Sequence, residues 1–222
     1  PTQTLQDHLF EELKGRLKKD DTSVPVRRRN YFYYSRYEAK KEHPIYCRRK
    51  GSMEAPETVI LDVNKLAKDH DYFNVGSIAI SENEDILAYT FDTLSRRIYT
   101  IAFIHLGSGE HLPDTISGTS TSLAWAADNR TLFYVDKDDK TLRPFSVHRH
   151  TLGTSQKEDY EVFKEKDESF YVGVGRSKSR RFVWITLEST NVSEVLYIEA
   201  KAPIEIPKAV SPRRPKIEYS VE

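Results

Sequence analysis

The fold of this chain is decided by residues 74–111, which read NVGSIAISENEDILAYTFDTLSRRIYTIAFIHLGSGEH. The stretch contains three strand-like runs, which are residues 77–80, 86–91 and 98–106. Each run is rich in β-branched and aromatic residues, and polar turn signals separate the runs. Gly107-Ser108-Gly109 closes the third run as a hairpin turn. The stretch therefore predicts three short antiparallel strands.

The same pattern then repeats along the chain. Residues 122–125 follow residues 77–80 at an offset of 45 (122 − 77), and they begin a second copy. Its further strands are expected at residues 131–135, 144–150 and 159–163. A looser third copy is expected at residues 170–174, 181–187 and 193–198. Repetition at this period is typical of repeat architectures.

The part before the opening stretch predicts one helix and one further unit. Residues 4–19 predict an amphipathic helix, with Thr4 as N-cap and a leucine every fourth residue. We expect this helix to pack on its own domain, and a coiled-coil partner is the alternative. Strands are expected at residues 31–37, 44–49 and 57–63, and a short helical connector at residues 64–68.

Four short antiparallel strands about every 45 residues are the signature of a β-propeller blade. In residues 86–91 and 98–104, apolar side chains point to both faces, which requires a sheet that is covered on both sides. The fold class is therefore all-β, a partial β-propeller of about three to four blades with a short N-terminal helix. A different all-β sandwich or barrel is the alternative. The expected domains are a helical lead-in at residues 1–22 and an incomplete propeller at residues 23–222, whose tail, residues 217–221, starts a further unit.

Composition excludes several classes of protein. Lys+Arg and Asp+Glu are both 34, so the formal net charge is zero, which argues against nucleic-acid binding and against attachment to an anionic membrane. No apolar run approaches the roughly 20 residues that span a bilayer, and the N-terminus has no apolar signal core. The one cysteine, Cys47, allows no intrachain disulfide. We expect a cytoplasmic location.

No residue of this chain is predicted to be catalytic, to bind a cofactor or to ligate a metal. There is no G-x-S-x-G motif, and Cys47 lies within a predicted strand, where a buried hydrophobe is more usual than a reactive thiol. His148 and His150 share a strand face as some metal ligands do, but no third ligand has suitable spacing. We expect both histidines to have surface or packing roles.

Three charged or glycine-containing stretches have ordinary structural explanations. Residues 136–139 lack the glycine and glutamate of a calcium loop and are expected to form a solvated turn. Residues 173–178 lack the G-K-[ST] ending of a phosphate loop. The basic clusters at residues 27–29 and 48–50 flank aromatic strands, and we expect them to be solvated blade edges rather than nucleic-acid contacts.

Arg96 and Arg97 lie in the most distinctive polar stretch, residues 92–99, and we expect them to pair with carboxylates of a neighbouring blade or domain. At this stretch the chain resembles oligopeptidase B (protease II), a branch of the prolyl oligopeptidase family of serine peptidases. The strings that carry the resemblance are ILDVN at 60–64, YFNVG at 72–76, FDTLSRRIY at 91–99, EKDESFYV at 165–172 and SEV at 193–195. The likeness covers nearly the whole chain.

The resemblance implies a seven-bladed propeller that caps an α/β-hydrolase domain, which holds the Ser, Asp and His of the catalytic triad. It implies cleavage of short peptides after Arg or Lys, with the propeller as the gate that excludes folded proteins. The chain corresponds to roughly the first half of such a propeller, so the hydrolase domain is absent from it and we expect it to be inactive alone. Its expected partners are short basic peptides and the hydrolase domain, without nucleic acid or membrane. The alternatives are a stand-alone protein-binding propeller and a subunit that completes its ring by association.

Overall fold

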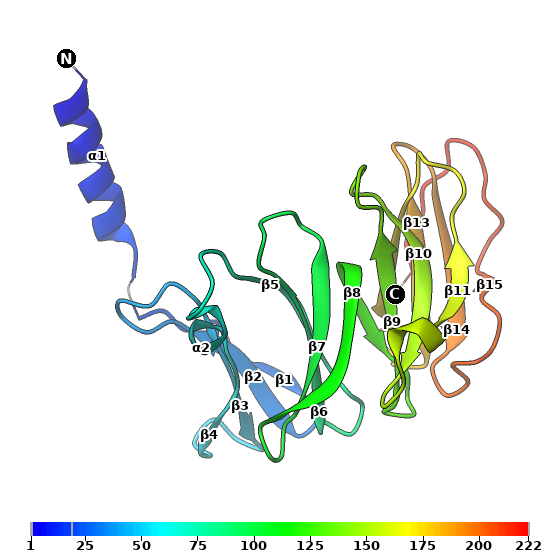
Figure 1. The fold of residues 1–222 in the computed structure, drawn as a ribbon, viewed down its shortest axis with the longest axis horizontal. Coiled ribbons are helices and arrows are strands. Elements are labelled where there is room, and N and C mark those ends of the chain that lie inside the picture. The colour runs from blue at the N-terminus through cyan, green and yellow to red at the C-terminus, as the bar shows by residue number, and fades with distance from the viewer. Residues whose placement is uncertain (1, 19, 222) are drawn as a thin grey trace. The chain divides into compact units, whose positions relative to one another are not determined.

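The computed structural model describes residues 2–18 and 20–221, and it divides into two compact units at residues 69 and 70. The first unit contains helix α1 (Gln3–Arg16), helix α2 (Val63–Ala67) and one sheet, coloured blue to cyan in Figure 1. The sheet has four antiparallel strands in the order of the sequence. They are β1 (Val26–Arg28), β2 (Tyr31–Arg36), β3 (Ile45–Lys50) and β4 (Glu57–Asp62). We call this sheet blade 1.

The second unit contains the repeats. Seven strands, from β5 to β11, form one antiparallel sheet in the order of the sequence, and β12 to β15 form another. The bounds are β5 (Asn74–Ile80), β6 (Ile86–Asp92), β7 (Tyr99–His105), β8 (Glu110–Trp125), β9 (Thr131–Lys137), β10 (Pro144–Thr151), β11 (Tyr160–Lys164), β12 (Tyr171–Arg176), β13 (Phe182–Glu188), β14 (Ser193–Glu199) and β15 (Lys208–Ala209). A 3₁₀ turn, η1 (Gln156–Glu158), precedes β11.

Strand β8 joins two blades because its two halves pair with different neighbours. Residues 110–119 pair antiparallel with β7, and residues 119–125 pair antiparallel with β9. The chain turns at Gly118, whose φ is +78°, and the register shifts beside this turn. We call β5, β6, β7 and the first half of β8 blade 2. Blade 3 is the second half of β8 with β9, β10 and β11, and blade 4 is β12 to β15 (Figure 1).

The hydrophobic cores of the second unit lie between blades. One core joins blades 2 and 3 through Ile101, Phe103 and Trp125. A second joins blades 3 and 4 through Phe133, Val147 and Ile185. Blade 3 is covered on one face by blade 2 and on the other by blade 4. Strands β6 and β7 read as nearly continuous buried runs, as predicted from residues 86–91 and 98–104. The all-β propeller prediction is confirmed.

Two terminal predictions are wrong. Helix α1 begins after Thr2 rather than Thr4, and none of its residues is buried. Its leucines are exposed rather than packed on their own domain, with exposed fractions of 59% for Leu5 and 62% for Leu13. At the other end, residues 217–221 form no strand. They fold back on β14 instead, where the Tyr219 hydroxyl accepts a hydrogen bond from the Val195 N–H at 2.9 Å.

Candidate functional site

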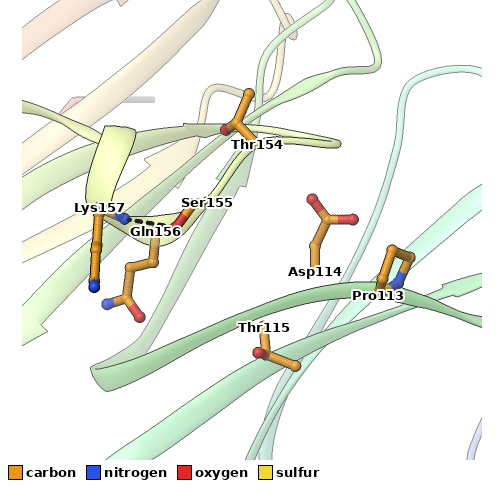
Figure 2. A pocket seen from close by; sticks show the side chains of 7 residues that line it. All are labelled: Pro113, Asp114, Thr115, Thr154, Ser155, Gln156 and Lys157. Carbon is orange, nitrogen blue, oxygen red and sulfur yellow. Dashed lines mark hydrogen bonds between the residues drawn. The ribbon is translucent and has the colours of Figure 1, made fainter.

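A polar pocket of about 550 Å³ lies where blade 2 meets blade 3 (Figure 2). Strand β8 supplies one wall, and the turn before η1 supplies the other. Its lining residues are Pro113, Asp114, Thr115, Thr154, Ser155, Gln156 and Lys157. The Gln156 side chain connects the walls, because its Nε2 donates to the Ser117 carbonyl and its Oε1 accepts from the Ser117 N–H, both at 3.0 Å.

The turn that forms the second wall is held by its own sequence. The Ser155 hydroxyl accepts the Lys157 N–H, and the Glu158 side chain accepts the Ser155 N–H at 3.0 Å. This reciprocal pair is a capping box, which fixes where η1 starts. The local sequence Ser-Gln-Lys-Glu therefore determines the shape of this wall, while its distance from β8 depends on tertiary contacts.

His150 is fully buried and contacts Asp114, one of the residues that line this pocket. Its Nδ1 lies 2.7 Å from Asp159 Oδ1, and its Nε2 lies 3.2 Å from Asp114 Oδ1. The second oxygen of Asp159 accepts a hydrogen bond from the Tyr134 hydroxyl at 2.9 Å. Asp114 Oδ1 also accepts the Gly153 N–H at 2.6 Å. Because both ring nitrogens face carboxylates, His150 has no nitrogen left with which to activate a neighbouring hydroxyl as a general base.

The charges around His150 shift its pKa. Burial alone lowers the pKa of an imidazole, but the hydrogen bonds and negative charges of Asp159 and Asp114 outweigh it. The pKa of His150 is therefore raised above its ordinary value of 6.5. The same surroundings raise the pKa of the Tyr134 phenol, through burial first and the charge of Asp159 second.

His148 occupies a different environment on the same strand. Its Nε2 lies 3.1 Å from Asp136 Oδ2 and 2.8 Å from the Ser146 hydroxyl, and its ring stacks on Tyr134. Both histidines were expected to have surface or packing roles; the structure buries His150 between two carboxylates and stacks His148 on Tyr134. Their partners were missed, because Asp114 is 36 residues from His150 in sequence and no spacing rule connects them. Within the described residues no group of His, Cys, Asp and Glu side chains is arranged to hold a metal ion.

A second pocket of about 270 Å³ lies beside the Arg96 stretch. Asp92 organises this stretch, because its buried carboxylate accepts the N–H groups of Leu94 and Arg97 at 2.8 Å and 2.7 Å. Arg96 reaches blade 3, where its Nη2 donates to the Asp139 carbonyl oxygen at 3.3 Å. The predicted contact of Arg96 with a neighbouring blade is present, but its acceptor is a carbonyl rather than a carboxylate.

Arg97 is not one of the lining residues of this pocket, but its backbone helps to hold the stretch beside it. Its N–H binds Asp92, and its carbonyl oxygen accepts the Lys137 ammonium at 2.6 Å. Burial and the nearby Arg97 charge lower the pKa of Lys137. Leu94, which lines the same pocket, is open to solvent, with an exposed fraction of 75%. The stretch is therefore an ordered, partly apolar surface rather than a flexible loop.

The remaining predicted sites have structural roles. Cys47 is fully buried in β3, and burial together with the charge of Glu57 raises the pKa of its thiol to about 11, so the thiol is unreactive. Arg27 and Arg28 are exposed on the edge strand β1, as expected. Arg48 is buried against the Tyr31 ring at 4.1 Å, so the prediction of a solvated edge is wrong for this residue. Asp138 caps the turn after β9.

Comparisons with known proteins place this geometry in a family. Residues 1–222 match the family described as "Prolyl oligopeptidase, N-terminal beta-propeller domain". Dipeptidyl aminopeptidase BI of Pseudoxanthomonas mexicana is 41% identical over 237 residues, which cover 100% of this chain and 33% of that protein. Protease 2 of Moraxella lacunata is 31% identical over 229 residues, with the same coverage of 100% and 33%.

Solved structures agree with these sequence matches. Oligopeptidase B from Leishmania major superimposes with a TM-score of 0.93 at 29% identity, over 99% of this chain and 32% of that one. Oligopeptidase B from Trypanosoma brucei, with covalently bound antipain, superimposes with a TM-score of 0.89 at 26% identity, over 99% and 31%. The chain spans about a third of the length of the relatives that it matches. No described helix is long and apolar enough to cross a membrane.

Proposed function

The chain belongs to the prolyl oligopeptidase family, as an N-terminal β-propeller of the oligopeptidase B type, and we propose that it gates substrate access to a serine oligopeptidase that cleaves short peptides after Arg or Lys. The observation that carries the proposal is the match of the whole chain to an N-terminal propeller domain and to about a third of the length of two peptidases. We further propose that the chain is inactive alone and that its partner is an α/β-hydrolase domain of the same protein. A single buried cysteine suits a reducing compartment, which supports a cytoplasmic location.

The strand order supports one side of the second unit as the docking surface for that hydrolase domain. We call this side the docking edge, and it is formed by the ends of the strands rather than by an outermost strand. In a blade of four antiparallel strands, the first strand begins and the fourth strand ends at the same edge. A domain joined before the first blade or after the last therefore connects at this edge. The Arg96 stretch and the turn at Gly118 both lie there, together with the exposed side chain of Leu94.

Helix α1 supports a docking role of its own. It presents an exposed apolar stripe, which comprises Leu5, Leu9, Leu13 and Leu17, with Phe10 beside it. A stripe of this kind normally lies against another surface. We propose that the hydrolase domain covers it, because about two thirds of the length of the relatives lies outside the segment that this chain matches.

A second candidate activity follows from the relative with 41% identity, whose name says that it is a dipeptidyl aminopeptidase. That activity removes dipeptides from a free N-terminus, whereas the first candidate cleaves after a basic residue whether or not the N-terminus is free. A stand-alone binding scaffold is the third candidate. The three differ in which chromogenic peptide the full-length protein cleaves.

The test uses the full-length protein, and this chain alone, with three chromogenic substrates. They are an N-blocked peptide that ends in Arg, a matched N-blocked peptide that ends in Ala, and an unblocked dipeptide. We expect the full-length protein to cleave only the N-blocked peptide that ends in Arg. We expect this chain alone to cleave none of the three substrates. Preference for the unblocked dipeptide favours the dipeptidyl activity. Absence of all cleavage by a folded full-length protein contradicts both enzymatic proposals and leaves the scaffold.

A further inference from the structure

Three side chains form a buried ionic contact between blades 2 and 3, and we call it the His150 joint. It consists of Asp114 on the first half of β8, His150 on β10, and Asp159 just before β11. The side chains of all three are at least nine-tenths buried, with exposed fractions of 5%, 1% and 2%. Asp114 belongs to blade 2, and the other two residues belong to blade 3.

The geometry of the joint determines its protonation state. An ionised carboxylate only accepts hydrogen bonds, and a neutral imidazole carries a proton on only one of its two nitrogens. Both ring nitrogens of His150 nevertheless lie within hydrogen-bond distance of carboxylate oxygens, at 2.7 Å and 3.2 Å. Both contacts are hydrogen bonds only when the ring is a doubly protonated imidazolium. The joint is thus complete only while His150 holds its second proton.

Deprotonation affects the two contacts unequally. The proton that remains stays on Nδ1, which faces the nearer carboxylate, Asp159. The lone pair of Nε2 then faces Asp114 Oδ1, and an attraction becomes a repulsion. Asp114 is still held by the Gly153 N–H, and Gln156 still bridges to Ser117, so the change is a local opening rather than a separation of blades.

The groups around the joint leave His150 as its titrating member near neutral pH. On β8 the facing charge is Asp114, and before β11 it is Asp159. On β9 the Tyr134 hydroxyl donates to Asp159, and its raised pKa keeps it protonated near neutral pH. On β7 the Phe103 ring stacks on His150 at 5.9 Å and carries no charge. Lys157 is the basic residue among those that line the pocket next to Asp114.

We propose that the His150 joint is a pH-dependent ionic contact between blades 2 and 3, which is closed at low pH and opens locally as the pH rises. The opening moves residues 110–117 away from residues 150–158, and these two segments include the lining residues of the 550 Å³ pocket, 113–115 and 154–157. The sign follows from linkage. A group whose pKa is higher in the closed state stabilises that state fully below its open-state pKa of about 6.5, and this stabilisation is lost as the pH rises through the closed-state pKa. The proposal concerns the fold of this chain and does not depend on the peptidase activity.

Hydrogen–deuterium exchange of the full-length protein between pH 5.5 and about 9 tests this proposal. Protection factors, corrected for the intrinsic pH dependence of exchange, are compared for residues 110–117, 150–158 and, as an internal reference, 182–188 in blade 4. We expect protection of the first two segments to fall by up to about tenfold per pH unit above about pH 6.5, while the reference stays constant. Equal behaviour of all three segments, or no pH dependence, overturns the proposal.

Two variants separate the joint from other titrations. Asp114→Asn keeps the shape and an acceptor oxygen but removes one charge, so the loss of protection should move to lower pH. His148→Gln changes a histidine on the same strand that is outside the joint, and it should behave as the wild type does. A wild-type profile in Asp114→Asn, or a shifted profile in His148→Gln, contradicts the assignment to His150. If Asp114→Asn does not fold, the wild-type and His148→Gln measurements still decide the question.

Discussion

The indole Nε1–H of Trp125 donates a hydrogen bond to the carbonyl oxygen of Ala79 at 3.1 Å, and this bond joins β5 of blade 2 to the second half of β8 in blade 3. Trp125 is buried, and its ring meets the Phe103 ring edge to face at 6.0 Å. One side chain therefore supplies both the polar and the apolar part of the contact between two blades.

Trp125→Phe should lower the free energy of unfolding by about 2–3 kcal/mol, because it removes the hydrogen bond to Ala79 and leaves a partly filled space. Urea unfolding monitored by circular dichroism measures the effect. Trp184→Phe is the matched control, because Trp184 is only partly buried among Phe182 and Tyr197. A loss as large for Trp184 as for Trp125 would show that the bond to Ala79 contributes nothing specific.

Gly76→Ala should be destabilising by about 1–3 kcal/mol, because side chains of β7 and of the second half of β8 lie too close to β5 to admit a Cβ. A Cβ at residue 76 would lie 2.4 Å from Thr121 Cγ2 and 2.7 Å from Tyr99 Cε1. Gly175→Ala is the control on the equivalent strand of blade 4, where a Cβ meets nothing within 4 Å. Its effect should be neutral or slightly stabilising. Thermal unfolding of both variants decides between close packing and a general preference for glycine.

The Cys47 thiol should react very slowly with Ellman's reagent in the folded protein. With its pKa raised to about 11 by burial, about one thiol in a thousand is ionised at pH 8, and the side chain is inaccessible as well. Addition of denaturant should restore the rate of an ordinary cysteine, because both burial and the Glu57 charge are then removed. Rapid labelling without denaturant would contradict the buried position in β3.

Asp128→Ala should cost about 1 kcal/mol at pH 7, because the carboxylate accepts hydrogen bonds from the Thr131 hydroxyl, the Thr131 N–H and the Arg130 N–H. The cost is small because the residue as a whole is exposed, so solvent screens much of the charge of its partly desolvated carboxylate. Burial acts to raise the pKa of Asp128, but these hydrogen bonds outweigh it and hold the pKa below 3.8.

The contribution of Asp128 should depend on pH in one direction. A depressed pKa stabilises the fold above the unfolded value of about 3.9, and the contribution is lost as the pH falls through the lower folded value. Urea unfolding at pH 7 and at pH 3 should therefore give a larger difference between wild type and Asp128→Ala at pH 7. Asp128→Asn keeps an acceptor for the turn, so its free energy of unfolding should lie between those of the wild type and Asp128→Ala. An equal difference at both pH values would refute the linkage.

Arg96→Ala combined with Arg97→Ala, in the full-length protein, tests whether the Arg96 stretch sets contacts between blades or domains. The bond to Asp139 links blades 2 and 3, so stability should fall by about 0.5–1.5 kcal/mol, and peptide turnover should change if the hydrolase domain docks at this edge. Arg214→Ala, at an exposed position near the end of the chain, is the control. Unchanged stability together with unchanged turnover would exclude this role for Arg96 and Arg97.

Local sequence accounts for most of the strands and the turns between them. The predicted strand at residues 86–91 is observed as β6, and its apolar residues on both faces correctly indicated stacked sheets. The strings that resemble the oligopeptidases correctly indicated the family. These features are readable because strand propensity, turn chemistry and two-sided burial act over a few neighbouring residues.

Tertiary structure alone decided which distant side chains meet. His150 was visible as a histidine on a strand, but its partners Asp114 and Asp159 come from other segments, and only the packing of blade 2 on blade 3 brings them together. The leucine stripe of α1 was visible as a pattern in the sequence. Such a pattern predicts that this face of the helix packs against another surface, but it does not identify that surface. Sequence by itself thus determined the repeating unit and its family, because those depend on local periodicity. The folded structure determined the ionic joint and the exposed stripe, because those depend on contacts between segments far apart in the chain.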